Sequence, residues 1–255
     1  MLMKIVKIQF SLGSLGKNEG CEKAPNLIVE KLKEYELSEG EKSVIFDVSE
    51  VKVDKNNFDL TFENIEKEQG DIFIGGDHST TYPCFRGMKG SDKGIIIFDA
   101  HPDLEVGTKT VDHESYLRKL IEEKSVKKEN VVLVGVRSFS KNELRFIKDN
   151  KIKCISMKSI FENGFKETAE DVMEIALGFS DLYLSIDIDV LDPAFAPGTG
   201  YPETGGLSIR ELLFFLQRFS KIRNLRRVDL VEVNPSKDKE GRTVDCGAKI
   251  ISTFF

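Results

Sequence analysis

The chain has 255 residues, of which 40% are hydrophobic and 31% charged, a composition typical of a globular protein with a substantial core. Its net charge of −6 argues against a surface that binds nucleic acid or an anionic membrane. No segment approaches 18 consecutive apolar residues, and the first ten residues lack the apolar stretch of a signal peptide. The four cysteines are scattered without a C-x-x-C spacing, which predicts reduced thiols, so we expect a cytoplasmic protein.

Short apolar segments alternate with helical patterns along the whole chain. The sequence predicts strands at residues 4–10, 43–48, 71–74, 94–98, 131–136, 152–157, 182–186 and 227–231. It predicts helices at residues 25–35, 62–68, 79–88, 113–123, 141–147, 167–177, 209–219 and 242–255. Ser208 and Glu211 form a capping box at the start of the helix 209–219. This alternation predicts an α/β protein of three α/β/α layers, with a mostly parallel sheet of about eight strands in a single domain, residues 1–255.

The stretch 94–103, G-I-I-I-F-D-A-H-P-D, combines a buried strand with metal-type ligands. The run 94–98 is apolar throughout, as in the middle of a parallel sheet. Asp99, His101 and Asp103 follow at every second position and cannot lie in an apolar core, so the strand must end at Phe98. We therefore expect these side chains at the carboxyl edge of the sheet, where open α/β sheets place their sites.

Two other predicted strands end in the same way. Asp77 and His78 follow the strand 71–74, and Asp187, Asp189 and Asp192 follow the strand 182–186. Each motif alone is weak, because such aspartates are common in turns. Together they bring so many carboxylates into one crevice that mutual repulsion requires a cation. The oxygen-rich set without thiolate favours Mn²⁺, with Co²⁺, Fe²⁺ or Zn²⁺ as substitutes, and its size fits two ions better than one.

Four motifs together resemble the ureohydrolases, a superfamily that comprises arginase, agmatinase, formiminoglutamase and guanidinobutyrase. They are G-G-D-H-S at 75–79, D-A-H-P-D at 99–103, S-I-D-I-D-V-L-D-P-A-F-A-P-G-T-G at 185–200 and E-V-N-P at 232–235, in the family's order. The resemblance runs from about residue 19 to the C-terminus. It implies an arginase-like fold and a hydrolase with two Mn²⁺ per chain that cleaves a guanidino or related C–N bond, with urea as the usual product. It also implies a homo-oligomer, a trimer or hexamer.

The resemblance assigns the metal ligands by motif. It implies one manganese held by His78, Asp99, Asp103 and Asp187, and another held by Asp99, His101, Asp187 and Asp189, with Asp99 and Asp187 bridging the two. Asp77 and Asp192 match the motifs but not the ligand positions. We expect Asp77 to support His78, and Asp192 to cap the turn before Pro193.

The resemblance also implies two catalytic and substrate-binding residues, Glu232 and His113. Glu232 follows the predicted strand 227–231, and its carboxylate suits the fork of a guanidinium group. His113 lies ten residues after Asp103, where the family places a histidine that transfers protons and contacts the substrate. One departure is Glu114, in D-H-E-S-Y, because the family often has glycine at this position.

Two features favour agmatine, cleaved to putrescine and urea, over arginine. The segment 104–112 is short, as in agmatinases, and offers no evident paired site for an α-carboxylate and an α-amine, although Lys109 could itself hold a carboxylate. D-P-A-F-A-P-G-T-G is also the agmatinase-like form. Since E-V-N-P is closer to arginases, arginase, guanidinobutyrase and formiminoglutamase activities remain alternatives.

Two other classes of function compete with this one. A metallophosphoesterase would need further histidines late in the chain, and none follows His113. A non-catalytic protein of the same fold would be expected to lack some of the six ligands, and all are present. The Gly/Pro-rich loop 196–206 lacks the Lys-Ser/Thr of a phosphate-binding loop, so we expect it to close the rim of the site.

Overall fold

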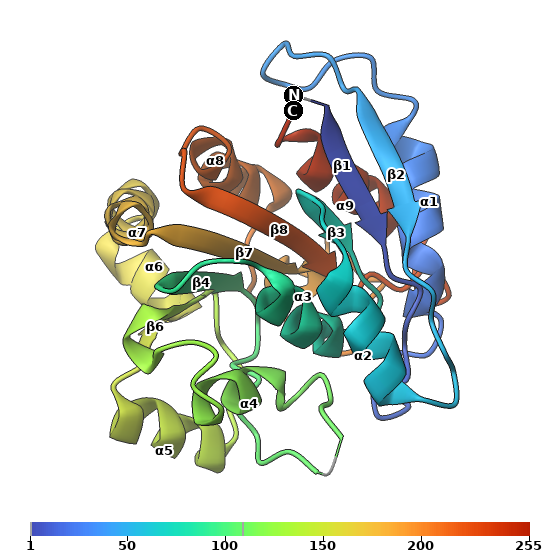
Figure 1. The fold of residues 1–255 in the computed structure, drawn as a ribbon. Coiled ribbons are helices and arrows are strands. Elements are labelled where there is room, and N and C mark those ends of the chain that lie inside the picture. Colours follow the sequence, from blue (N-terminus) through green and yellow to red (C-terminus); the bar gives the residue numbers. More distant parts are fainter. Residues whose placement is uncertain (1, 109) are drawn as a thin grey trace.

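The computed structural model describes residues 2–108 and 110–255, which contain one parallel sheet of eight strands (Figure 1). Lys109 lies outside the described residues. The strands follow each other across the sheet in the order β2 (Phe46–Glu50), β1 (Met3–Lys7), β3 (Ile72–Ile74), β8 (Leu225–Val231), β7 (Asp181–Asp187), β4 (Lys93–Phe98), β5 (Val131–Val134) and β6 (Lys153–Ile155). All neighbouring pairs are parallel, which confirms the predicted α/β class.

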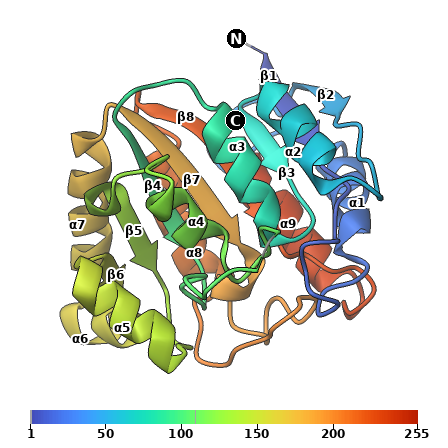
Figure 2. The same ribbon diagram turned by 60° about the horizontal axis from the view of Figure 1, so that its bottom comes forward.

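Helices cover both faces of the sheet, as Figures 1 and 2 show. One face carries α1 (Ala24–Leu32), α6 (Met157–Asn163), α7 (Phe165–Gly178), α8 (Ile209–Phe219) and α9 (Arg242–Ser252). The other carries α2 (Phe58–Lys67), α3 (Thr81–Gly87), α4 (Tyr116–Glu122) and α5 (Lys141–Asn150). A separate buried apolar cluster fills the space between each helical layer and the sheet. The three-layer arrangement predicted from the alternating pattern is confirmed.

The structure differs from the predicted elements at two instructive places. The sequence pattern continues a strand to Met157, whereas α6 begins there because the Ser156 side chain accepts a hydrogen bond from Ser159 N and caps a new helix. The helix predicted from residue 113 begins only at Tyr116, because residues 112–115 form a turn closed by a Ser115 Oγ to Asp112 Oδ1 hydrogen bond. The capping box of α8 is present as predicted.

Phe98, the last residue of β4, connects the apolar core to the site. Its side chain is fully buried, and its ring meets those of Phe215 and Phe219 on α8 edge to face, at centroid distances of 5.2 and 6.0 Å. We expect Phe98→Ala to lower the free energy of unfolding by about 3–5 kcal/mol, because the truncation leaves a cavity. Phe161→Ala on α6, where the ring is 89% exposed, is the control and should change it by less than about 0.5 kcal/mol. Urea denaturation measures both, and equal effects would contradict this packing.

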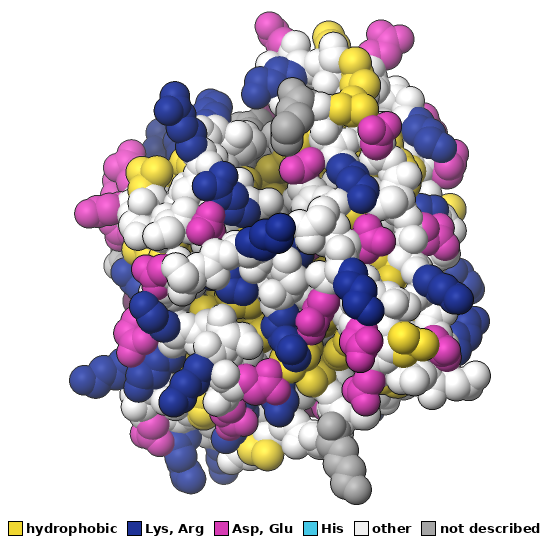
Figure 3. Space-filling view, viewed as in Figure 1, with side chains coloured by type: hydrophobic (Ala, Val, Ile, Leu, Met, Phe, Trp, Pro, Cys, Tyr) yellow, Lys and Arg dark blue, Asp and Glu magenta, His cyan; other side chains and the backbone are white. Residues whose placement is uncertain are grey.

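The surface carries both signs of charge. Figure 3 shows lysine and arginine side chains interspersed with aspartate and glutamate over the face seen in Figure 1. Within residues 2–108 and 110–255, none of the helices combines the length and the hydrophobicity that crossing a bilayer requires.

Candidate metal centre

Four adjacent strands, β3, β8, β7 and β4, deliver the candidate site residues to one edge of the sheet. In the register of the sheet, Phe98 of β4 lies opposite Ile186 of β7, and Asp187 lies opposite Val231 of β8. Asp99, Asp187 and Glu232 therefore emerge at nearly the same level. Parallel strands align their carboxyl ends in this way, which explains why residues far apart in the sequence meet here.

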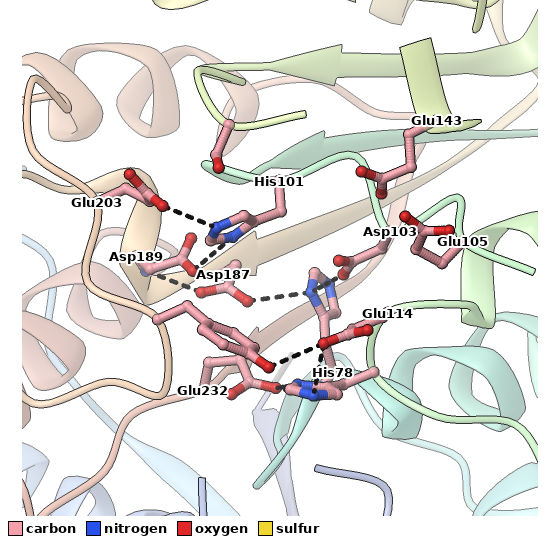
Figure 4. A pocket seen from close by; sticks show the side chains of 13 residues that line it. His78, His101, Asp103, Glu105, Glu114, Glu143, Asp187, Asp189, Glu203 and Glu232 are labelled. Atoms are coloured by element: carbon pink, nitrogen blue, oxygen red, sulfur yellow. Dashed lines mark hydrogen bonds and ion pairs between the residues drawn. The ribbon is translucent and has the colours of Figure 1, made fainter. Parts of the chain in front are cut away.

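The first cluster forms around the imidazole of His78, in a short 3-10 turn after β3. The Oδ2 atoms of Asp99, Asp103 and Asp187 lie 3.2, 3.0 and 3.1 Å from His78 Nδ1. Figure 4 shows Asp103 and Asp187 beside the His78 ring. His78 Nδ1 and Asp99 Oδ2 are nevertheless buried without a partner in hydrogen-bond geometry. Three carboxylates that converge on one unsatisfied nitrogen form a ligand set that a cation would complete.

The far side of the His78 ring is held by side chains that the sequence analysis did not single out. His78 Nε2 lies 3.0 Å from Ser185 Oγ and 2.9 Å from Tyr116 OH, and Ser185 Oγ donates to Asp229 Oδ1 at 2.6 Å. These contacts leave Nδ1 for the cluster. Ser185 lies in the motif S-I-D-I-D and Tyr116 in D-H-E-S-Y. No local sequence pattern indicates that either residue contacts His78.

Asp77 and Asp192 have capping contacts in the structure. Asp77 Oδ1 accepts from Ser79 N at 3.0 Å, so its carboxylate fixes the turn that begins at His78. The His78 ring itself is held by Ser185 and Tyr116, so Asp77 supports it only through the backbone. Asp192 accepts from Ala194 N at 2.9 Å and from Gly205 N at 2.7 Å, which confirms the expected turn cap.

The second cluster consists of Asp99, His101 and Asp189. His101 Nδ1 lies 3.0 Å from Asp189 Oδ2 and 3.6 Å from Asp99 Oδ1. Asp99 belongs to both clusters, whereas among the described residues Asp187 belongs to the first only, and its Oδ1 accepts from Asp189 N at 2.8 Å. Asp99 is thus shared by the two clusters. The bridging roles expected of Asp99 and Asp187 stay predictions.

The buried carboxylates of the two clusters would be stabilised by a nearby positive charge. Burial and the nearby charge of Asp99 raise the pKa of the Asp103 carboxyl to about 8. Burial and the charges of Asp189 and Asp99 raise the pKa of Asp187 well above its ordinary value. A divalent cation among these groups would keep them ionised at neutral pH. The donor set of carboxylates and imidazoles, with no thiolate, fits a hard metal ion such as Mn²⁺.

Glu232 and His113 meet beside the first cluster. Glu232 Oε1 accepts from His78 N at 2.7 Å and lies 3.1 Å from His113 Nδ1, while Oε2 accepts from Asn18 Nδ2 at 2.6 Å. Glu232 has a φ of 65°, a left-handed conformation that such contacts must hold in place. Asn18 was missed because its partner lies 214 residues away in the sequence.

The protonation of His113 is set by this pair. Burial by itself lowers the pKa of His113, but the hydrogen bond to Glu232 and the charge of that carboxylate raise it to about 9. The same contact, against the effect of burial, lowers the pKa of Glu232. His113 Nε2 is buried without a hydrogen-bond partner. The pairing with Glu232 therefore favours the protonated ring, and Nε2 is left without a partner.

A cavity of about 270 Å³ opens over both clusters and joins them to His113 and Glu232. Tyr201 and Glu203 of the loop 196–206 line it, so this loop lies at the rim as expected. Arg137 fastens the loop to the site, because its Nη2 donates to the main-chain oxygens of Asp189 and Glu203 at 2.7 Å each. The fold and the site thus define an α/β protein whose cavity holds two carboxylate-rich clusters that could bind metal ions.

Comparison with known proteins identifies the family. The sequence model described as the arginase family matches residues 3–255. An arginase from Staphylococcus aureus (strain COL) is 32% identical over 93% of this chain and 83% of its own length, and an agmatinase from Bacillus subtilis (strain 168) is 34% identical over 73% and 63%. The crystal structure of formimidoylglutamase from Bacillus subtilis superposes with a TM-score of 0.93 over 100% of this chain and 86% of that chain. Because the two sequences are 21% identical, this similarity shows a shared fold alone. The chain belongs to the arginase family, a member of the ureohydrolase superfamily and thus a hydrolase.

Proposed function

We propose that the protein is an agmatinase-type hydrolase that cleaves a guanidino C–N bond, releasing urea and putrescine from agmatine. The observation that carries this proposal is the position of Glu232 and His113 beside two ligand clusters in one cavity. The relatives named arginase and agmatinase are 32% and 34% identical, so sequence similarity does not decide the substrate. Arginase, guanidinobutyrase and formiminoglutamase activities remain the alternatives.

We propose six metal ligands and two manganese ions per chain. His78, Asp99, Asp103 and Asp187 would hold one ion, and Asp99, His101, Asp187 and Asp189 the other. When bound, the pair would polarise a water molecule and supply a nucleophile at neutral pH. The unsatisfied His78 Nδ1 and Asp99 Oδ2 support this assignment.

Glu232 would hold the guanidinium, and His113 would act on the leaving group. The Glu232 carboxylate is fixed by Asn18 and the His78 main chain, and a guanidinium prefers such an oriented carboxylate. An amine leaves readily only when protonated, and His113 Nε2 can supply that proton from inside the cavity. We further propose that residues 1–255 form a single catalytic domain, and that the protein is a cytoplasmic homo-oligomer, a trimer or hexamer, with no nucleic-acid or membrane partner.

The substrate assignment is tested by urea release. We expect agmatine to exceed L-arginine by at least tenfold in kcat/KM, about 1.4 kcal/mol of differential transition-state stabilisation. The reason is that the short segment 104–112 offers no evident pair of groups for an α-carboxylate and an α-amine. The assay uses Mn²⁺-loaded protein and a panel of guanidino compounds at equal concentration. If L-arginine is hydrolysed as well or better, the assignment is wrong, and Lys109→Gln shows whether that lysine holds the carboxylate.

A further inference from the structure

Three carboxylates that line the cavity have no part in the proposed function. They are Glu105, Glu114 and Glu203, which we call the anionic mouth. Two divalent ions would balance the four aspartates of the clusters, and a guanidinium would balance Glu232. Glu143, another acidic lining residue, already accepts hydrogen bonds from two main-chain N–H groups. Among residues 2–108 and 110–255, no lysine or arginine lines the cavity to balance the charge of the anionic mouth.

Main-chain hydrogen bonds hold the backbone of the anionic mouth beside the two clusters. The N–H of Glu105 donates to the carbonyl oxygen of Glu114 at 3.0 Å, so these two residues are held together. Arg137 binds the carbonyl oxygens of Glu203 and Asp189, which fixes the Glu203 backbone against the second cluster. The backbones of the three glutamates thus have defined positions relative to the two clusters.

Glu114 and Glu203 border the space beyond His113 and His101. Glu114 Oε1 accepts from Tyr201 OH at 2.9 Å and lies 3.9 Å from His113 Nε2, the buried nitrogen without a partner. Glu203 points toward His101, but its Oε1 lies 3.8 Å from Nε2, too far for a hydrogen bond (Figure 4). The Tyr201 ring stacks on His113 at a centroid distance of 5.7 Å. Both carboxylates therefore keep acceptor positions for a ligand that fills this space.

We propose that the anionic mouth selects guanidino compounds whose far end is an ammonium group over those whose far end is a carboxylate. The inference rests on the proposed function, because it takes the guanidinium to lie at Glu232. An ammonium at the mouth is attracted by Glu105, Glu114 and Glu203, whereas a carboxylate there meets three like charges. The side chains of Glu203 and Glu114 are 40% and 39% exposed, so solvent screening limits the preference to about tenfold.

Three guanidines of matched length test the proposal. Agmatine, n-pentylguanidine and 5-guanidinopentanoate end in an ammonium, a methyl and a carboxylate group. For the Mn²⁺-loaded wild type we expect kcat/KM for agmatine about tenfold above n-pentylguanidine, and 5-guanidinopentanoate about tenfold below it. Glu114→Gln and Glu203→Gln should each lower the ammonium-to-methyl ratio by about threefold, and the triple variant with Glu105→Gln should bring it close to one. Glu162→Gln on α6 is the matched control, with the wild-type ratio expected.

Several outcomes would overturn the proposal. A wild-type preference for the carboxylate compound would do so, as would an unchanged ratio in the triple variant. Metal analysis accompanies each assay, and loss of Mn²⁺ in Glu203→Gln would mean that Glu203 orients His101 instead of forming the mouth. If none of the three compounds releases urea, the proposed function fails. Calorimetric affinities of the same three compounds then test the anionic mouth by itself, and equal affinities refute it.

Discussion

Asp99→Ala should reduce kcat on the order of 10³-fold or more and remove bound manganese. Asp99 is the carboxylate common to both clusters, with Oδ2 3.2 Å from His78 Nδ1 and Oδ1 3.6 Å from His101 Nδ1. Its loss would take a ligand from each ion at once. The expected factor corresponds to several kcal/mol of lost transition-state stabilisation, the scale of metal-ion catalysis. Metal analysis after dialysis against chelator and Mn²⁺ repletion should give two ions for the wild type and fewer for the variant.

Asp192→Asn is the matched control for this substitution. Asp192 belongs to the same acidic run as Asp187 and Asp189, but its carboxylate accepts hydrogen bonds from Ala194 N and Gly205 N in a turn. The variant should retain two ions. Hydrolysis that survives chelation of the wild type, or a stoichiometry of one, would contradict the binuclear assignment.

His113→Asn should lower kcat by roughly 10- to 10⁴-fold while both manganese ions and the fold are retained. His113 is held by Glu232 at Nδ1, its Nε2 has no hydrogen-bond partner, and the residue lines the cavity, so a protonated ring could donate to a leaving amine. Asparagine preserves a polar side chain at this position but carries no transferable proton at neutral pH. Imidazole added to the buffer should restore part of the rate. A variant with a near-wild-type kcat would remove His113 from the reaction, and loss of manganese would mean that it is a ligand.

The pH dependence provides an independent check on the same residue. The hydrogen bond to Glu232, acting against burial, raises the pKa of His113 to about 9, so the ring is protonated at pH 7 and loses its proton as the pH rises. Bound divalent cations would lower this pKa from that value. The wild-type kcat should therefore fall on the alkaline side, at or below pH 9, and this limb should be absent from His113→Asn. An identical alkaline limb in both proteins would contradict the assignment.

The fold was predictable because each strand carries a local signal. Apolar runs such as 94–98 are followed directly by charged residues. Because a strand buried on both faces cannot contain such residues, they mark its end in the sequence. Ser208 and Glu211 likewise mark the start of α8 within four residues of sequence. The helix α6 was not predicted, because the apolar pattern around residues 152–157 indicates a strand. In the structure the Ser156 cap starts a helix within this pattern.

The sequence by itself determined which strand ends carry the candidate ligands. Asp99 directly follows β4, Asp187 is the last residue of β7, and His78 lies in the turn after β3. Only the tertiary structure decided what surrounds them. The pairing of Glu232 with Asn18, and of His78 with Tyr116, joins segments that no local pattern relates. The anionic mouth also exists only where the loops after β4 and β7 meet. Backbone propensity and apolar periodicity act over a few neighbouring residues, whereas a cavity wall is set by sheet order and by main-chain contacts between distant loops.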